Sequence, residues 1–542
     1  MQIEQSRIKP YTIAGFMVPG VIVQYLLLAV TIRLTPHAAA GLMVPAAVYY
    51  FAAWGAFLVA VRKRVYRFVR IYYGNGFYIN AKESSRTAIL KTAGLTVPVA
   101  LVVMLLARPL SEAVCASVKA RLPLYVSAVC AVLMGAEGVL FGFAEGMGKK
   151  KTVLTLDILR CALTVLICVP LAFTGFRYGR KLDDLLFSAD HTALYTVLFV
   201  FIGFLCTEVL VTLLLLVVRA SVLKKLEPLH ETGKPRYLGD PPSLYTSCGP
   251  FMLATMLPQV PVLTGCAFLR MRSGAELSAA EMTALCGSYA SRFVLIVMIA
   301  GLLSTLPFLK HCYRIPGMND DIDTGEAAIR YRRMIHRQSI LCFPVGLFLT
   351  ALAEPLQTAV FALPDDTASL LTGTCGLAAT FLSFFVTVCL LLVLTKRRAR
   401  LVSSCIVSAA VAAGSGFVLI VILNASAAGA AVALLLSLLV FVLLGVSGLN
   451  RLFMPGRGMV RGEVLRPFLL SAVSALAMYL AATFLVHVIG EIPTCVVCFF
   501  GGSLMYLSLM AFFRGFEPGD LTAVPLGRLF TGISMRGRAV RE

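Results

Sequence analysis

Charged residues are scarce in this chain of 542 residues, because Asp, Glu, Lys and Arg together make up 14% of it. Soluble globular domains contain about 25% charged residues, so a large soluble domain is excluded. Hydrophobic residues account for 59% of the chain, which is typical of a membrane protein. The chain has no Gly-x-x-x-x-Gly-Lys-Ser/Thr segment, so nothing indicates nucleotide hydrolysis. We expect neither an enzyme nor a nucleic-acid-binding protein.

Paired cysteines and clustered histidines are equally rare. The 15 cysteines are scattered singly along apolar segments, where cysteine behaves as a small hydrophobic residue. Cys495 and Cys498 form a Cys-x-x-Cys pair, but no second pair and no histidine cluster accompanies it. The sequence therefore predicts no metal site, no redox centre and no cofactor.

Long apolar runs dominate what remains. A membrane-spanning helix needs about 20 mostly apolar residues, and fourteen runs reach that length. The first run is too long for the apolar core of a signal peptide, so we interpret it as a retained helix. The fold class expected is an all-α polytopic membrane protein with helices at about 11–32, 42–61, 87–107, 122–145, 152–174, 192–218, 242–268, 282–309, 338–361, 369–395, 402–423, 427–449, 466–488 and 493–513.

Basic residues outnumber acidic ones, 48 against 27, and most of them lie in alternate loops between these runs. Loops rich in Lys and Arg stay on the cytoplasmic side of a membrane. This distribution predicts that the N- and C-termini are both cytoplasmic. The net charge of +21 thus reflects topology first and attraction to anionic membrane lipids second.

A hydrophilic stretch at 221–241 separates six predicted spans from eight. The first span carries Pro19 and Gly20, and the seventh carries Pro250 and Pro258. Glycine- and proline-interrupted helices at matching places in two halves indicate a transporter built from internal repeats. We expect these four residues to act as hinges.

Several segments resemble one family of membrane proteins. Phe141–Met147 with the lysines after it looks like the end of the fourth helix of SpoVB-like flippases, although Glu145 replaces the usual Gln. Tyr289–Phe293 is similar to a Tyr-Ala-Asp-Arg pattern of MurJ-type lipid II flippases. Further segments are similar in the same order: Arg330–Phe361 to the ninth helix of the SpoVB-like proteins, Gly429–Ala431 to the start of the twelfth, and 520–527 to the tail.

This resemblance implies the MOP superfamily of transporters. Its members have two six-helix bundles related by pseudo-two-fold symmetry, here 1–220 and 242–450 around the linker at 221–241, with two additional helices at 451–514 and a basic tail at 515–542. The implied function is a flippase that moves a lipid-linked, undecaprenyl-type oligosaccharide or peptidoglycan precursor across the bacterial cytoplasmic membrane by alternating access. The lipid-linked glycan, membrane lipids and envelope glycosyltransferases are the partners expected.

Five ionisable residues lie well inside the predicted spans: Glu137, Asp157, Arg160, Glu208 and Arg292. Each costs roughly 2.5–3.5 kcal/mol to insert, which makes each a functional candidate. Asp157 and Arg160 share one helix face and are expected either to pair with each other or to line a cavity. Glu137 lies on a regular helical stripe that is able to face the same cavity. We assign these three residues to substrate binding.

Glu208 and Arg292 have more specific roles in this interpretation. A deeply buried carboxyl takes up a proton readily, so Glu208 is assigned to ion coupling, with a hydrogen-bonded neutral side chain as the alternative. The planar guanidinium of Arg292 suits a phosphate group of the substrate. Its alternative is a structural ion pair with Glu208 or Glu137.

Three other functions remain open on the sequence. A cation-coupled multidrug exporter of the same superfamily would use Glu137 and Glu208. MurJ-type flippases carry more arginines in their first two helices than this chain does, which leaves room for a non-transporting scaffold of envelope assembly. A membrane-embedded glycosyltransferase would need an acidic cluster, for which Asp320, Asp321 and Asp323 are the candidates.

Overall fold

The computed structural model describes residues 10–35, 38–187, 191–226, 244–274, 276–315, 324–453, 463–513 and 515–516, and every element within these ranges is a helix. The chain divides into two compact units. Unit 1 comprises Met1–Leu295 and Arg397–Phe441, and unit 2 comprises Ile296–Lys396 and Val442–Glu542. The predicted linker and tail lie largely outside the described residues, as does the acidic cluster at 320–323.

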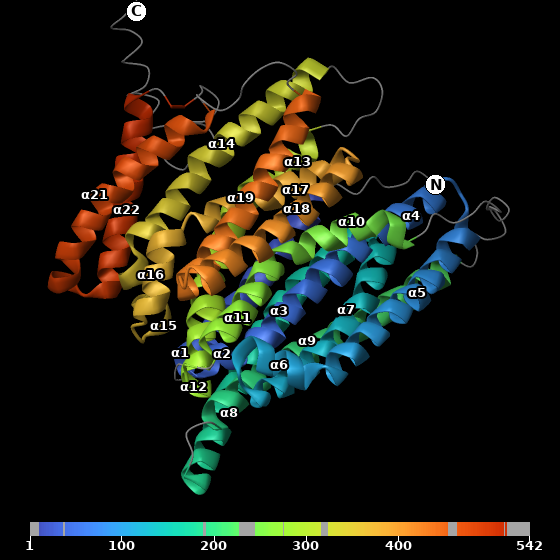
Figure 1. Ribbon diagram of the computed structural model, residues 1–542. Coiled ribbons are helices and arrows are strands. Elements are labelled where there is room, and N and C mark those ends of the chain that lie inside the picture. Colours follow the sequence, from blue (N-terminus) through green and yellow to red (C-terminus); the bar gives the residue numbers. More distant parts are fainter. Residues whose placement is uncertain are drawn as a thin grey trace, which may run out of the picture. The chain divides into compact units, whose positions relative to one another are not determined.

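Unit 1 contains α1 to α12 with the short helical segments between them, and later in the chain α18 with η6 (Figure 1). Its elements are α1 (Pro10–Leu34), α2 (Ala38–Leu42), α3 (Val44–Ala53), η1 (Trp54–Val61), α4 (Arg62–Gly74), α5 (Tyr78–Leu105), α6 (Ala107–Cys115), η2 (Val118–Ala120), α7 (Arg121–Gly146), α8 (Lys150–Leu186), α9 (His191–Leu226), α10 (Leu244–Met256), η4 (Leu257–Gln259), α11 (Val260–Ser273), α12 (Ala279–Gly287), η5 (Ser288–Phe293), α18 (Arg398–Gly416) and η6 (Phe417–Ile422).

Unit 2 contains the central and last helices. Its elements are α14 (Thr324–Ala351), α15 (Ala353–Phe361), α16 (Asp366–Cys375), α17 (Ala378–Leu394), α21 (Leu465–Ile489) and α22 (Glu491–Phe512). Two long helices, α13 (Val294–Arg314) and α19 (Ser426–Phe453), contribute residues to both units.

The described residues contain 13 helices long and apolar enough to cross a membrane. A fourteenth span results when α16 and α17, which meet at a bend of 56°, are counted as one. The prediction of an all-α polytopic membrane protein with fourteen spans is therefore confirmed. The division into two symmetry-related six-helix bundles stays a prediction.

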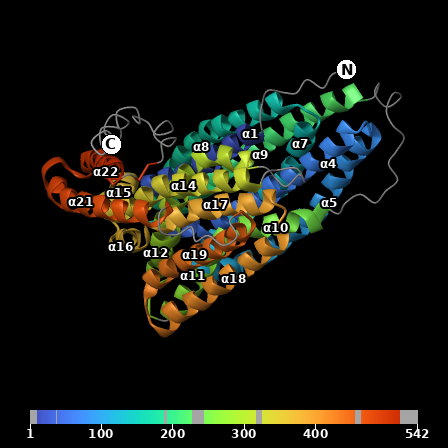
Figure 2. The same cartoon turned by 90° about the horizontal axis from the view of Figure 1, so that it is seen from above.

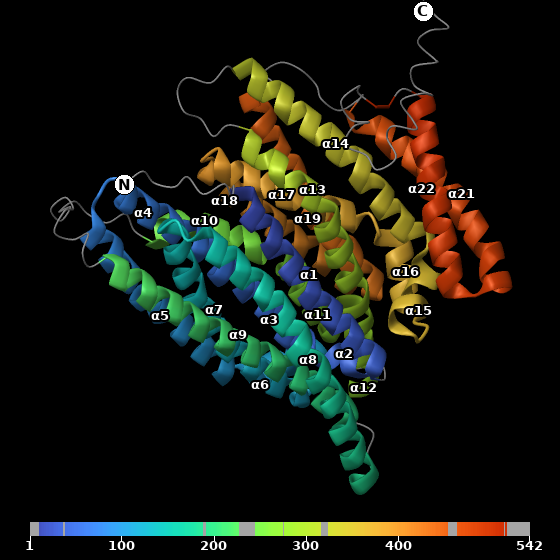
Figure 3. The same ribbon diagram turned by 180° about the vertical axis from the view of Figure 1, so that it is seen from behind.

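Several helices are longer than the predicted spans. The fifth and sixth spans are α8 and α9, with 37 and 36 residues. At 1.5 Å per residue, each exceeds the roughly 30 Å of a hydrocarbon core. The end of α8 extends beyond the other helices of unit 1 in Figure 1 and Figure 3.

A row of glycines draws α7 against its neighbours in unit 1. A Cβ atom placed at Gly138 would lie 2.4 Å from the carbonyl oxygen of Phe57 in η1, and one at Gly142 would lie 2.6 Å from that of Arg62 in α4. Small residues of this kind let membrane helices approach closely. In Figure 2, α4 and α7 lie close to each other at one edge of unit 1. The acidic residues of α7 are thereby brought next to α3, α4, α8 and α9.

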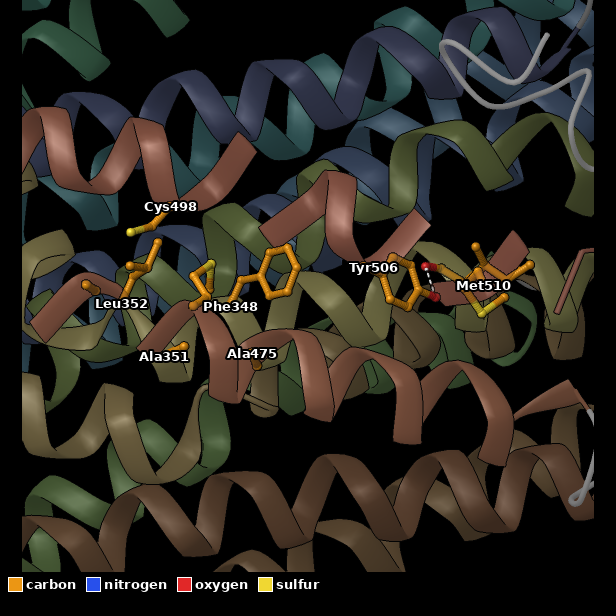
Figure 4. Close-up of a cluster of buried hydrophobic side chains, with 10 residues drawn as sticks. Phe348, Ala351, Leu352, Ala475, Cys498, Tyr506 and Met510 are labelled. Carbon is orange, nitrogen blue, oxygen red and sulfur yellow. Dashed lines mark hydrogen bonds between the residues drawn. The ribbon is translucent and has the colours of Figure 1, made fainter. Parts of the chain in front are cut away.

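The last two helices of unit 2 pack as a pair against α14 (Figures 1 and 4). Phe348 of α14, Met478 of α21 and both Tyr506 and Met510 of α22 belong to one buried apolar cluster. The hydroxyl of Tyr506 donates a hydrogen bond to the carbonyl oxygen of Ile340 at 2.9 Å. The pair is therefore fixed to α14 by apolar packing and by one buried polar contact.

An uncharged polar network joins α13, α14 and α17 within unit 2. The hydroxyl of Ser383 accepts hydrogen bonds from Thr305 at 3.1 Å and from the amide of Gln338 at 3.2 Å. Thr387 donates to the Gln338 amide oxygen at 2.9 Å. Between membrane helices, such contacts satisfy polar groups that lipid leaves unpaired.

Candidate functional site

The centre of unit 1 holds a buried ionic cluster around Arg160 of α8. Its guanidinium Nη2 lies 2.5 Å from both carboxylate oxygens of Glu208 in α9, and its Nη1 lies 3.4 Å from Oε2 of Glu137 in α7. Both glutamate side chains are fully buried, and that of Arg160 is 8% exposed. We call these three residues the Arg160 cluster. It holds two carboxyl groups for one guanidinium.

Uncharged side chains complete the surroundings of the Arg160 cluster. The hydroxyl of Tyr50 in α3 donates to Oε1 of Glu208 at 2.8 Å, and the amide of Gln24 in α1 donates to the Tyr50 hydroxyl at 2.8 Å. Thr212 of α9 donates to Oε1 of Glu137 at 3.0 Å. Five helices thus contribute polar groups to one buried network.

A second buried ionic cluster lies one turn away along α8. Arg62, the first residue of α4, binds Asp157 through two hydrogen bonds of 3.0 and 2.8 Å, and its Nε lies 3.4 Å from Oε2 of Glu145 in α7. The Arg62 guanidinium also lies 4.5 Å from the ring centre of Phe141. We call Arg62, Glu145 and Asp157 the Arg62 cluster. It repeats the ratio of two carboxyl groups to one guanidinium.

The two clusters correct one sequence interpretation. Asp157 and Arg160 share a helix face as expected, but they do not pair with each other: Asp157 pairs with Arg62, and Arg160 pairs with Glu208 and Glu137. Asp157 is instead held by two hydrogen bonds from the planar guanidinium of Arg62. The predicted site residues Glu137, Arg160 and Glu208 are brought together.

A pocket lies beside both clusters between α1, η1 and α8. Its lining includes Gln24, Trp54, Asp157, Arg160 and Thr164. Cys161 also lines it, whereas Cys168, two turns further along α8, packs against Gly203 of α9. We call this space pocket 1.

The predicted hinge residues lie in the first and seventh spans. Pro19 is inside α1, and Gly20 lines pocket 1. Pro250 is inside α10, and Pro258 lies in the short turn η4 that separates α10 from α11. The seventh span is thus interrupted close to the predicted position, while hinge motion itself stays a prediction.

Arg292 lies apart from these clusters. It belongs to the π-helical segment η5, and its side chain is buried with 1% exposure. Both glutamates considered as its counter-ions are held by Arg160. Neither pocket 1 nor the second pocket of unit 1, described below, is lined by Arg292.

Three members of these networks were not identified from the sequence. Arg62 begins a run of basic residues that the topology argument assigns to a loop, and Tyr50 and Gln24 are ordinary polar residues of apolar runs. Glu145 was noted in the sequence only as the residue that replaces the usual Gln of the SpoVB-like motif. Within the described residues, no group of three or more His, Cys, Asp or Glu side chains is arranged to hold a metal ion.

Comparison with solved structures identifies the fold. A structure of the lipid II flippase MurJ in an inward closed conformation covers 92% of this chain and 98% of its own, with a TM-score of 0.56 and 12% identity. An inward-facing MATE family multidrug resistance transporter of the MOP superfamily covers 83% and 96%, with a TM-score of 0.52 and 13% identity. A MOP superfamily transporter from Pyrococcus furiosus covers 84% and 99%, with a TM-score of 0.51 and 13% identity.

These comparisons establish that the chain has the fold of MOP superfamily transporters, which confirms the resemblance inferred from its motifs. No family model matches the sequence. No curated protein matches it either. The fold is therefore shared at identities that do not by themselves define a substrate.

Proposed function

We propose that this protein is a flippase that moves a lipid-linked, undecaprenyl-type cell-envelope oligosaccharide or peptidoglycan precursor across the bacterial cytoplasmic membrane by alternating access. The observation that carries this proposal is the helix pair α21 and α22. The MurJ structure covers 92% of the chain and the MATE transporter 83%. The difference, 9% of 542 residues, is close to the combined length of α21 and α22. We infer that these two helices lie beyond the MATE-like part of the chain, which favours the flippase.

In this proposal, the Arg160 cluster couples transport to an ion gradient. With both glutamates ionised, the cluster carries one net negative charge in a buried site, where an uncompensated charge is unfavourable. Binding of one proton or one sodium ion restores neutrality. We therefore assign Glu208 to ion coupling. We assign Glu137 to the same role because it pairs with the same arginine.

Substrate contact is assigned to Asp157, Arg160 and Arg292. The first two line pocket 1, which supports contact with a ligand that enters there. Arg292 is a buried guanidinium next to Ser291, which lines the second pocket. Glu137 lines neither pocket, so its position favours ion coupling over substrate contact.

The test is a flipping assay with purified protein in lipid vesicles. A fluorescent undecaprenyl-linked oligosaccharide is placed in one leaflet, and its arrival in the other is measured with an impermeant quencher. We expect exchange that depends on the protein and increases with an imposed proton or sodium gradient. An exchange rate equal to that of protein-free vesicles would contradict the proposal.

A cation-coupled multidrug exporter is the second candidate. The likeness to MATE transporters and the excess of carboxyl groups in the Arg160 cluster favour it. Gradient-driven movement of a cationic dye, without movement of the lipid-linked oligosaccharide, would decide for the exporter. Movement of neither would favour the scaffold of envelope assembly, for which envelope glycosyltransferases are the expected partners.

A further inference from the structure

Spans from the two halves of the chain meet in unit 1 at two glycine contacts. At the first, α2 crosses the end of α12. A Cβ atom at Gly41 would lie 2.1 Å from the carbonyl oxygen of Thr283, and one at Gly287 would lie 2.7 Å from the backbone nitrogen of Gly41. Ser291 donates a hydrogen bond to the carbonyl oxygen of Ala40 at 2.5 Å. We call this crossing the Gly41–Gly287 contact.

The second contact joins the same span of the first half to the seventh span. Gly55 is the second residue of η1, and a Cβ atom placed there would lie 2.7 Å from the Cβ of Thr255 in α10. Further along, the ammonium of Lys63 lies 5.2 Å from the ring centre of Phe251 in α10. We call this crossing the Gly55–Thr255 contact.

A second pocket of unit 1 lies between these contacts along the chain. Its lining comprises residues of α1, residues between Gly41 and Gly55, and residues that follow Thr255 or Gly287 in their spans. We call this space pocket 2. The stacked rings of Tyr25 and Phe51, with centres 3.9 Å apart, line it, as does Gln259. No charged side chain is part of its lining.

We propose that the two glycine contacts are the two gates of the transport pathway, with pocket 2 as the passage between them in an occluded state. This inference rests on the proposed transport by alternating access, but not on the identity of the substrate. At each contact the helices approach closely but share few hydrogen bonds. Separation of the helices therefore breaks few hydrogen bonds. The π-helical segments η1 and η5 adjoin the contacts, and such segments are frequent at functional sites.

The gates predict opposite effects of two small substitutions. An added methyl group clashes with backbone at Gly287 and with Thr255 at Gly55, so each substitution should hold one gate open while the other stays closed. Gly94 in α5 has no atom within 4 Å of its Cβ position, so Gly94→Ala is the matched control. Ala47, which lines pocket 2, serves as the reporter position through Ala47→Cys.

The experiment measures labelling of this reporter by an impermeant maleimide in right-side-out and inside-out vesicles, above the labelling of the chain without the reporter. We expect Gly287→Ala to increase labelling severalfold from one side only, and Gly55→Ala from the opposite side only. Gly94→Ala should change neither. Equal labelling from both sides, or no change in folded variants, would overturn the assignment of gates.

A cross-link provides a second test that adds no Cβ atom at a glycine. The Ser291 side chain lies within hydrogen-bond distance of the Ala40 carbonyl oxygen, so cysteines at these two positions are close enough for a short thiol-cleavable cross-linker. Cross-linking of the Ala40→Cys, Ser291→Cys variant should abolish flipping, and reductive cleavage should restore it. Ala40→Cys alone is the control, because Cys286 lies on the same span as Ser291.

The two tests separate the gates from the cargo. Unimpaired flipping after complete cross-linking would refute the gate. The labelling experiment needs no substrate, so it decides the gates even where the parent protein moves no lipid-linked glycan.

Discussion

Arg160 and Arg62 are each shared by two carboxyl groups from different helices of unit 1. A buried ion pair stabilises little compared with apolar packing, but removal of one partner leaves an uncompensated charge. Because each arginine serves two acids, its loss strands more charge than the loss of either acid. The arginines are therefore the most sensitive positions of both clusters.

Substitution of Arg160 by Ala should lower the free energy of unfolding by about 3–5 kcal/mol, since two buried carboxyl groups lose their counter-ion. Addition of Glu208→Gln should recover part of this loss. Thermal unfolding of the purified variants measures both effects. Arg108→Ala, which removes an exposed ion pair with Glu112, is the control and should change stability by less than about 1 kcal/mol. An unchanged melting temperature for Arg160→Ala would contradict the ionic description.

Glu208→Gln should leave the protein folded and weaken the dependence of transport on an ion gradient. The amide keeps an oxygen that accepts the hydrogen bond from Tyr50, while the group that binds a cation or proton is lost. Transport rates in vesicles with and without a gradient measure the effect. Glu112→Gln, an exposed position, is the matched control. Unchanged gradient dependence would leave Glu208 with a structural role.

Arg292→Ala should abolish flipping with the protein still inserted, and Arg292→Lys should impair it strongly, because an ammonium loses the two-point geometry toward phosphate. Since Arg160 holds both Glu137 and Glu208, neither Glu137→Gln nor Glu208→Gln should restore transport to Arg292→Ala. Flipping rates of the single and double variants test this. Recovery in either double variant would assign Arg292 as a counter-ion.

At the scale of helices, the sequence predicts where the membrane spans lie but not which residues of neighbouring spans contact one another. Apolar runs locate membrane helices because the lipid requires a continuous apolar surface. The described residues contain 13 such helices, or 14 when the bent pair of α16 and α17 counts as one span. Their lengths were underestimated for α8 and α9, since the ends beyond the bilayer are polar. Arg62 was assigned to a loop because it begins a run of basic residues. No sequence feature distinguishes it from its basic neighbours as the residue that pairs with Glu145 and Asp157.

The additional helix pair offers a direct measure of element packing. Met478→Ala in α21 removes a buried side chain from the cluster with Phe348 and Tyr506, and it should lower the free energy of unfolding by about 2–5 kcal/mol. Thermal unfolding in detergent reports this loss. Leu480→Ala, on the exposed face of the same helix, is the matched control and should have a much smaller effect. Equal effects of both substitutions would contradict the observed packing of α21 on α14 and α22.

For the whole molecule, the distribution of Lys and Arg among alternate loops predicts its orientation in the membrane, because translocation of basic loops is disfavoured. With both termini cytoplasmic, the loop between α4 and α5 is inside, and the loops after α11 and before α16 are outside.

Three cysteine substitutions at solvent-accessible positions at or next to helix ends test this orientation. Ser273 and Thr367 are partly exposed near the predicted outer loops, and Asn75 is exposed in a predicted cytoplasmic one. In intact cells, Ser273→Cys and Thr367→Cys should react with an impermeant maleimide, whereas Asn75→Cys should react only after the membrane is permeabilised. Labelling is compared with the parent chain, whose own cysteines are mostly buried. The reverse pattern would invert the topology, while the packing of unit 1 would remain as described. Labelling of Ser273→Cys and Asn75→Cys from the same side would instead contradict the assignment of the intervening helices as spans.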